Sequence, residues 1–341
     1  MAERVRIVDV ASLAGVSTAT VSRALSAPET VGPATRKKVM EAVRTTGYRI
    51  NSAARDLRQR RARSILILAP NLSNTFFSRI FAAIQEEAGA VGLTVQISDS
   101  RIGRDKLVSL GYDGRADGIV LLDGNIDPEV VNGWNLPLVQ LSEWNESYDA
   151  PRLVFDNPAA ARLAVDHLAD LGHRALLHVS GPAENVLAET RRAGFLEAAA
   201  ARAVSAEVFD GDFTLAAGAE AARRWAGLAE RPTGVFCASD ECALGFISEC
   251  GRLGVSVPRD VSVIGFDDID FADHFLPALT TIRQPREEMG RQAARMIVAM
   301  LEGQGAAAGA TGAPIAPELV VRGTTLPACP AAARSEAAAE G

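Results

Sequence analysis

The first helical pattern of the chain lies near its amino terminus, in Ile7–Leu25. Apolar residues recur there at steps of three and four, as on one face of a helix; they are Val10, Ala11, Ala14, Val16, Val21, Ala24 and Leu25. Gly15 interrupts them where a tight turn needs a residue without Cβ, and the Ser17 hydroxyl can cap a second helix. The pattern predicts a helix-turn-helix, whose second helix, about Thr18–Leu25, would lie in a DNA major groove. The alternative is a helical hairpin that only packs.

A third helix is expected from Pro33 to about Thr46, ending at Gly47, because proline is tolerated in a first turn. Its apolar positions Val39, Met40 and Val43 would close a small core over the first two helices. The segment that starts at Tyr48 contains Asn51, which can cap a short helix carrying Ala53, Ala54 and Leu57. Such a helix is too short to be stable alone in water. A charged linker is the alternative, because Arg58, Arg60, Arg61 and Arg63 follow.

From Ile65 onward, short apolar runs alternate with helical stretches. Strands are expected at 64–69, 93–97, 117–122, 137–141, 175–179, 206–209, 234–237 and 261–265, and helices at 76–90, 157–171, 189–201, 214–227 and 240–252. This alternation is typical of βαβ units with a parallel sheet, and it restarts after Asp156. The fold class is therefore α/β, with a helix-turn-helix unit followed by two doubly wound subdomains. A ligand cleft is expected outside the carboxyl ends of the strands.

Charge is segregated along the chain. Residues 1–63 hold 13 Lys and Arg against 5 Asp and Glu, a net charge of +8, whereas the remainder carries −15. A basic amino-terminal segment on an acidic body is the electrostatic pattern expected when one end of a protein neutralises phosphates. A solvated charged face explains a few of these residues, but not their segregation.

Other classes of function find little support in the 341 residues. Neither an 18-residue apolar run nor a signal-peptide core occurs, so we expect a cytoplasmic protein without a membrane partner. The four cysteines lack CxxC spacing, so we expect reduced thiols and no metal. His167, His173 and His178 lie in or beside a helix-to-strand connection and are expected to be structural, and His274 is expected near the cleft. No P-loop, GxSxG or HExxH motif is present, so neither an enzyme nor a bound cofactor is expected.

The amino-terminal pattern DVAxxAGVSxATVSRAL (9–25), followed by GY and an Asn-led basic segment, resembles the DNA-binding headpiece of the LacI/GalR family of bacterial repressors. The resemblance implies that Thr18, Ala19 and Arg23 read bases, and that Ser17, Thr20 and Ser22 contact phosphates. The segment after Tyr48 resembles the hinge of that family, which becomes helical on the operator and inserts a leucine into the minor groove. Leu57 matches that leucine, and Asn51, Ala54 and Arg58 are further candidates for DNA contact. Ile50 stands where the family usually has proline.

The body resembles the periplasmic-binding-protein-like core of the same family. The matching motifs are DNPAAARLAVDHLADLGHR (156–174), ASDECALG (238–245), VSVIGFDDID (261–270) and LTTIRQPREEMGR (279–291). GDFT (211–214) and ELVVRGTT (318–325) look most like the cytidine repressor branch. Between Ser98 and Asp117, where the family usually has a longer helix, this chain has three glycines, and the helix is expected to be short.

The resemblance implies four segments: a headpiece (1–49), a hinge (50–63), a core that binds an effector and dimerises (64–326), and a flexible tail (327–341). The core divides into one subdomain of about 64–155 plus 284–301 and another of 156–283 plus 302–326.

A small polyhydroxylated ring needs an aromatic face and charged forks for paired hydroxyls. The family's effector positions correspond here to Phe76, Phe77, Asp156, Arg191, Phe213, Ser239, Asp240 and Asp267, and Glu143 and Trp144 follow another strand. Core packing is an alternative for Phe76, Phe213 and Trp144, and a structural ion pair for Arg191 and Asp267.

The expected function is a repressor whose binding to near-palindromic double-stranded operator DNA is controlled by a sugar or nucleoside. One headpiece reads a half-site, so a homodimer is expected, and the tail lacks the leucine heptads that make some relatives tetramers. Two other classes of protein are alternatives. A periplasmic solute-binding protein requires a signal peptide and leaves the basic headpiece without a role, and a cleft enzyme requires a nucleophile or metal set.

Overall fold

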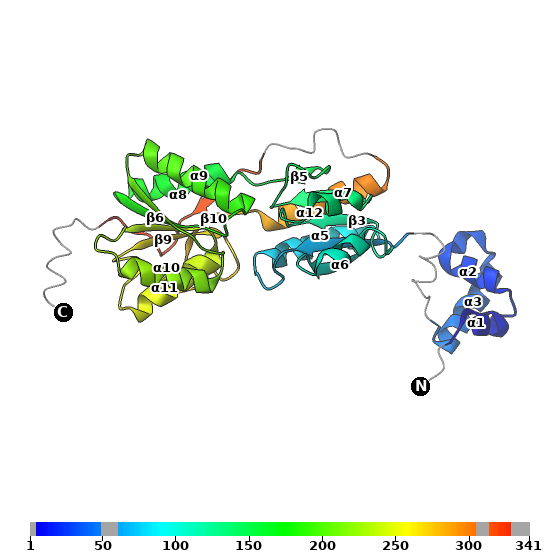
Figure 1. Cartoon of the computed structure of the whole chain (residues 1–341). Helices are drawn as coiled ribbons and strands as arrows, with labels where there is room; N and C mark the ends of the chain where they lie inside the picture. Colours follow the sequence, from blue (N-terminus) through cyan, green and yellow to red (C-terminus); the bar gives the residue numbers. More distant parts are fainter. Residues whose placement is uncertain (1–4, 49–60, 305–313, 329–341) are drawn as a thin grey trace. The chain divides into compact units, whose positions relative to one another are not determined.

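The computed structural model describes residues 5–48, 61–304 and 314–328, and it divides into two compact units, Met1–Arg61 and Ala62–Gly341 (Figure 1). Each unit has a hydrophobic core of its own. The hinge candidates Asn51, Ala54, Leu57 and Arg58 lie outside the described residues, as do Ile50 and most of the tail. Those predictions therefore stay predictions.

In its described residues, 5–48, the first unit is a helix-turn-helix with a third helix packed on it. Its helices are α1 (Ile7–Ala14), α2 (Thr18–Ser26) and α3 (Pro33–Thr46), with a 3-10 turn at Pro28–Thr30. Gly15 makes the turn after α1 at φ 64°, and the Ser17 Oγ accepts the Thr20 N–H at 3.2 Å to cap α2. The predicted helix-turn-helix and its cap are thus confirmed.

The core of this unit differs from the prediction at one position. Val39 is fully buried and Val43 is partly buried, but Met40 is 42% exposed. Ala42, at 3% exposure, fills the place expected for Met40. The reason is geometric, because Val39, Ala42 and Val43 are three and four residues apart and share one face of α3, whereas Met40 points about a quarter-turn away.

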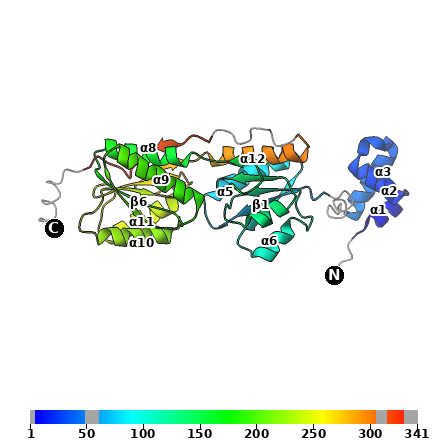
Figure 2. The same ribbon diagram turned by 45° about the horizontal axis from the view of Figure 1, so that its top comes forward.

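The second unit contains two subdomains, each a parallel sheet with helices on both faces (Figures 1 and 2). The first sheet has the strand order β2-β1-β3-β4-β5. Its strands are β1 (Ser64–Ala69), β2 (Thr94–Asp99), β3 (Gly118–Leu121), β4 (Leu138–Leu141) and β5 (Arg152–Leu153). Helices α5 (Phe77–Ala90) and α12 (Arg286–Leu301) pack together over one face, and α6 (Arg104–Leu110) and α7 (Pro128–Gly133) cover the other.

The second sheet has the order β11-β10-β9-β8-β6-β7, and only β11 is antiparallel to its neighbour. Its strands are β6 (Ala175–Val179), β7 (Ser205–Phe209), β8 (Gly234–Cys237), β9 (Ser262–Asp267), β10 (Thr280–Arg283) and β11 (Glu318–Val320). Helices α8 (Asn157–Asp170) and α9 (Val186–Ala201) cover one face, and α10 (Leu215–Ala226) and α11 (Asp240–Arg252) cover the other. The predicted α/β class with two doubly wound subdomains is confirmed.

The chain passes from the first subdomain to the second between β5 and α8, and it returns between β10 and α12. Helix α12 therefore packs on α5, although some 200 residues of sequence separate the two. The seven residues of α6 make it a short helix, as expected from its flanking glycines. Several elements were not predicted from the pattern, namely α7, β5, β10, α12 and β11.

Candidate functional site

The exposed face of α2 is the candidate DNA-reading surface of the first unit. Val21 and Ala24 point into the core, and this leaves Thr18, Ala19 and Arg23 exposed on the other side of the helix. Ser17 is also exposed, and its hydroxyl lies 2.9 Å from that of Thr20. Ser22 is half-buried. The exposed face of α2 thus presents small side chains from its first turn and one arginine, Arg23, from its last turn.

Side chains from both subdomains enclose a small cavity in the second unit, which we call the central cavity. Its volume is about 40 Å³. It is lined by Asn74, Phe76, Phe77, Leu122, Ser142, Glu143, Leu187, Arg191, Phe213, Ser239, Asp267 and Gln284. Six of these were predicted from the sequence as effector contacts: Phe76, Phe77, Arg191, Phe213, Ser239 and Asp267.

Arg191 projects from α9 into this cavity and is 3% exposed. Its Nε donates to Asn157 Oδ1 at 2.8 Å and its NH1 to the Ala238 carbonyl at 2.6 Å. The guanidinium lies over the Phe266 ring, 3.6 Å from the centroid. Burial lowers the pKa of Arg191 to about 10, against the opposing effect of Asp267 and Glu143. The residue therefore stays charged at neutral pH, with NH2 bonds still to donate.

Two buried carboxyl groups face the cavity, one from each subdomain. Burial raises the pKa of Asp267 to about 6, although Arg191 and a 2.8 Å hydrogen bond from Gln284 act against it. Burial also raises the pKa of Glu143 to about 7, although the Gly124 N–H donates to it at 3.1 Å. Perturbed acids beside a buried cation in a shared cavity are typical of functional sites.

Phe213 reaches the cavity through a close approach to the backbone. Its own φ is 67°, and a Cβ at Gly181 would lie 2.1 Å from the Phe213 ring. Only glycine at position 181 therefore leaves room for this ring.

Three predicted effector contacts do not line the central cavity. Asp156 caps α8 by accepting the Ala159 N–H at 3.0 Å. Asp240 is fully buried and accepts bonds from Thr281 Oγ1 at 2.5 Å and from the Ile269 N–H at 2.8 Å. Trp144 is half-buried and is not among the lining residues. Short acidic side chains at helix starts satisfy backbone donors, and sequence alone does not separate this role from ligand binding.

The cavity also contains residues that were not predicted from the sequence as effector contacts: Asn74, Leu122, Ser142, Glu143, Leu187 and Gln284. Leu122, Ser142 and Gln284 directly follow β3, β4 and β10. The carboxyl ends of parallel strands meet at the ligand-binding edge of such sheets. That rule, applied to the predicted strands at 117–122 and 137–141, would have found Leu122 and Ser142, but Gln284 follows a strand that the pattern did not predict.

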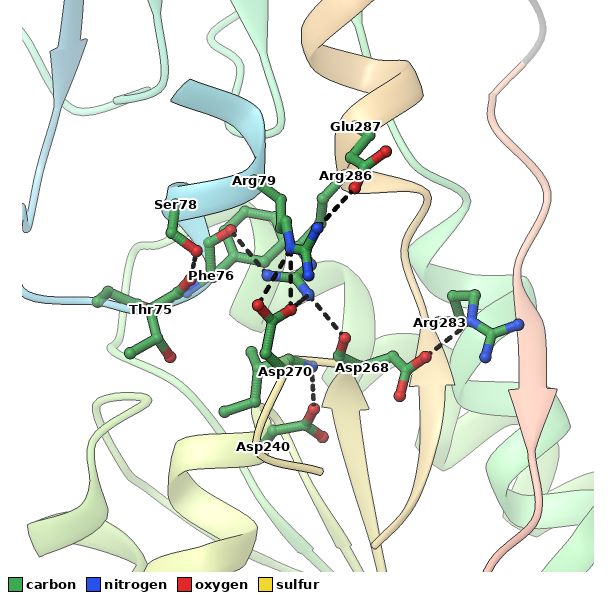
Figure 3. Close-up of polar contacts among 12 residues, drawn as sticks. Thr75, Phe76, Ser78, Arg79, Asp240, Asp268, Asp270, Arg283, Arg286 and Glu287 are labelled. Atoms are coloured by element: carbon green, nitrogen blue, oxygen red, sulfur yellow. Dashed lines mark hydrogen bonds and ion pairs between the residues drawn. The ribbon is translucent and has the colours of Figure 1, made fainter. Parts of the chain in front are cut away.

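Figure 3 shows how the two subdomains bond to each other beside the cavity. Arg79 of α5 donates from Nε to both oxygens of Asp270 at 3.1 Å. Arg286, at the start of α12, donates from NH2 to Asp270 and to the Asp268 carbonyl, at 3.1 and 2.8 Å. Nearby, Glu241 of α11 accepts from the N–H and the hydroxyl of Thr75.

The histidines lie away from the central cavity. The ring of His178 is fully buried, stacks on Phe236 with centroids 4.8 Å apart, and bonds the Phe236 carbonyl at 3.0 Å through Nδ1. Burial lowers its pKa to about 4. His167 bonds the Thr325 hydroxyl, and His173 bonds the Thr233 hydroxyl and the Leu326 carbonyl. His274 is exposed and is not among the residues that line the central cavity.

In residues 5–48, 61–304 and 314–328, no group of three or more His, Cys, Asp or Glu side chains is placed to hold a metal ion. Among the helices of those same segments, none has the length and apolar content needed to cross a bilayer.

Comparison with known proteins matches both units. The family described as "Bacterial regulatory proteins, lacI family" matches residues 6–51, and "Periplasmic binding protein-like domain" matches residues 165–325. The HTH-type transcriptional repressor CytR of Escherichia coli (strain K12) is 36% identical over 326 residues, which are 93% of this chain and 95% of that protein. Catabolite control protein A of Priestia megaterium is 32% identical, over 86% of this chain and 90% of its own length.

Solved structures agree with the sequence matches. The crystal structure of the Lac repressor dimer bound to operator and an anti-inducer has a TM-score of 0.83 and 28% identity, over 95% of this chain and all of that one. A complex of the transcriptional regulator CelR with cellobiose has a TM-score of 0.69 and 28% identity, over 94% of this chain and all of that one.

A helix-turn-helix unit joined to a periplasmic-binding-like core defines a class of DNA-binding transcriptional regulators that respond to small molecules. The identity and coverage above then assign the family. The chain belongs to the lacI family of bacterial regulatory proteins, and it is a transcriptional regulator, not an enzyme.

Proposed function

We propose that this chain is a cytoplasmic repressor whose binding to operator DNA is controlled by an uncharged sugar or nucleoside in the central cavity. The observation that carries the proposal is the shared lining. Phe76 and Phe77 come from one subdomain, and Arg191 and Asp267 come from the other. A ligand held by both halves has different contacts in open and closed forms, so it shifts their populations.

The cavity's size supports a gated site. Pockets for drug-sized ligands usually measure roughly 300–1,000 Å³, whereas the central cavity encloses about 40 Å³. A nucleoside therefore enters only when the subdomains move apart. The aromatic rings would then cover the apolar face of the ligand, and Arg191 with Asp267 would bind its hydroxyls.

On the DNA side, Thr18, Ala19 and Arg23 are proposed to read bases, and Ser17, Thr20 and Ser22 to hold phosphates. Asn51, Ala54, Leu57 and Arg58 are proposed contacts of a hinge helix that enters the minor groove. The functional form is proposed to be a homodimer, because two-fold related half-sites need two headpieces. The relatives support this form, since a solved neighbour is a Lac repressor dimer on its operator.

The sign of control is proposed to be induction, so that the ligand releases DNA. The likeness to CytR motivates this choice, as it motivates the choice of nucleosides among the candidate ligands.

A gel-shift titration tests the proposal. A duplex selected from a random pool by the protein itself serves as operator, with and without cytidine, adenosine, uridine and D-ribose. We expect at least one of these ligands to weaken the specific shift. A ligand that strengthens binding to the duplex would refute induction. If the protein selects no sequence from the pool, its proposed role as a sequence-specific repressor would be refuted.

A further inference from the structure

The loop and first helical turn from Thr75 to Arg79 face in two directions. The rings of Phe76 and Phe77 line the central cavity. On the other side, the same few residues make polar bonds to the second subdomain, at Thr75 and Arg79. A change in these bonds therefore moves the aromatic wall of the cavity.

The bonds form a connected network, drawn in Figure 3, which we call the junction network: Arg79, Asp268, Asp270, Arg286 and Glu287. Arg79 bridges Asp270 of the second subdomain and Glu287 of α12, with the latter bond at 3.0 Å. Asp270 thus receives two arginines, Arg79 and Arg286. Burial acts to raise the pKa of Asp270, but the bonds from these arginines outweigh it and lower the pKa.

Arg286 ties the network to the cavity wall. It is 7% exposed, and its NH1 lies 3.5 Å from the Phe76 carbonyl, at the limit of a hydrogen bond. Its NH2 bonds the Asp268 carbonyl in the loop directly after Asp267. The guanidinium of Arg286 therefore contacts both the loop after Asp267 and the backbone of Phe76 in the aromatic wall.

We propose that Arg79 and Asp270 are positioning residues of the effector site, which hold the subdomains closed around the central cavity. This inference rests on the proposed function, because a closed cavity of this size must open before an effector enters. Opening separates Thr75 from Glu241, and Asp270 from both Arg79 and Arg286, whereas the bond from Arg79 to Glu287 lies within the first subdomain and persists.

The Arg79–Asp270 bond is half-exposed, with the two side chains at 49% and 52% exposure. Exposed pairs of this kind contribute little to global stability and weaken with salt. They suit a contact that must open and close repeatedly.

The chain provides a matched control. Arg295 of α12 holds Glu87 of α5 through two hydrogen bonds of 3.2 and 2.7 Å. This pair joins α5 to α12, as the bond from Arg79 to Glu287 does. Its arginine is similarly exposed, at 59%, but the pair lies within one subdomain. Arg295→Ala therefore removes a comparable ion pair and leaves the junction network intact.

Hydrogen–deuterium exchange on the full chain without ligand tests the proposal. The Thr75 amide donates to Glu241 at 3.1 Å across the subdomains, so its exchange reports their separation. We expect Arg79→Ala to accelerate exchange at Thr75 about two- to fivefold, Arg79→Lys to have a smaller effect, and Arg295→Ala to have none. High salt should accelerate Thr75 exchange in the wild type and in Arg295→Ala, but have a weaker effect in Arg79→Ala.

Equal exchange at Thr75 in Arg79→Ala and Arg295→Ala would overturn the proposal, as would a salt response that is the same in all variants. Because no ligand is added, this result does not depend on the operator assay. Failure of that assay to find an effector would count against the proposed function alone.

Discussion

The guanidinium of Arg191 interacts with acids from both subdomains, Glu143 and Asp267, in a space with little access to water. A buried charge is tolerated when it is paired and hydrogen-bonded, and the loss of one partner then costs far more than the pair contributes. One arginine facing two acids also makes the cavity unfavourable for a phosphate or carboxylate on the enclosed part of a ligand. Hydroxyl and amine donors are favoured instead.

Glu143 should lower the stability of the fold at neutral and higher pH. Its pKa is raised from 4.5 to about 7, so the folded state holds its proton where the unfolded state has lost it. The stability that comes from this proton is present below pH 4.5 and is lost as the pH rises through 7. As the pH rises from 4.5 to 7, the free energy of unfolding of Glu143→Gln should therefore increase by about 3 kcal/mol relative to that of the wild type.

Urea unfolding across this pH range measures the gain. The control Glu146→Gln removes an exposed carboxylate of the same loop, at 75% exposure, and should follow the wild type. A flat difference between Glu143→Gln and the wild type would show that burial does not hold a proton on this residue.

Arg23 should control sequence preference. Arginine can bond guanine bidentately, and one such contact is worth roughly 1–3 kcal/mol of discrimination. Arg23→Ala should therefore lose more affinity for the selected operator than for random DNA. Lys37→Ala, which removes an exposed charge of α3, should weaken both equally and flatten the salt dependence. Competition binding at several salt concentrations checks this, and an equal loss for both DNAs in Arg23→Ala would argue against base reading.

At the scale of elements, the amino-terminal cap of α2 sets where this helix begins. Helices of this length are marginal by themselves, so the cap and the packing of Val21 and Ala24 together hold the helix. The exposed first turn is also where DNA contacts are expected, which makes a frayed turn costly for function.

Ser17→Ala should fray this turn. Loss of such a cap costs about 0.5–2 kcal/mol, which corresponds to amide exchange in the first turn of α2 some 2- to 30-fold faster. Ser22→Ala, inside the same helix, should leave exchange unchanged or slower, because alanine is the better helix former. Exchange measured without DNA in the full chain separates the two, and equal behaviour would mean that the cap does not hold the turn.

At the scale of the whole molecule, the proposed regulation requires that the open and closed forms of the core bind the ligand with different affinities. Coupling between sites is typically about 1–3 kcal/mol, or roughly 5- to 150-fold in operator affinity. Arg191, Asp267 and the aromatic wall supply the different contacts.

Asp267→Ala should abolish the response of operator binding to whichever nucleoside or sugar acts on the wild type, while affinity for the operator without ligand changes little. The control Asp273→Ala removes an exposed acid a few residues further on, at 70% exposure. Operator titrations of both variants with the active ligand provide the measurement. A normal response of Asp267→Ala would exclude Asp267 from the effector site.

Local patterns determined much of this protein. The helix-turn-helix is specified by apolar side chains at steps of three and four residues, together with Gly15, Ser17 and Pro33. Helix faces, turns and caps depend on neighbours in sequence. The alternation of buried strands with helices likewise specifies the α/β class. Six members of the central cavity followed from motifs that resemble the family.

Only the tertiary structure decided how distant segments meet. Asp156 and Asp240 lie at the starts of helices and Asp267 ends a strand, yet the first two bond the backbone or a buried threonine, and only the third lines the cavity. Glu143 and Asp267 are more than a hundred residues apart, and crossings of the chain bring them near Arg191. Arg79 of α5 likewise meets Asp270, in the loop after β9, although 191 positions in sequence separate them. Such contacts depend on the relative placement of whole elements, which no local pattern encodes.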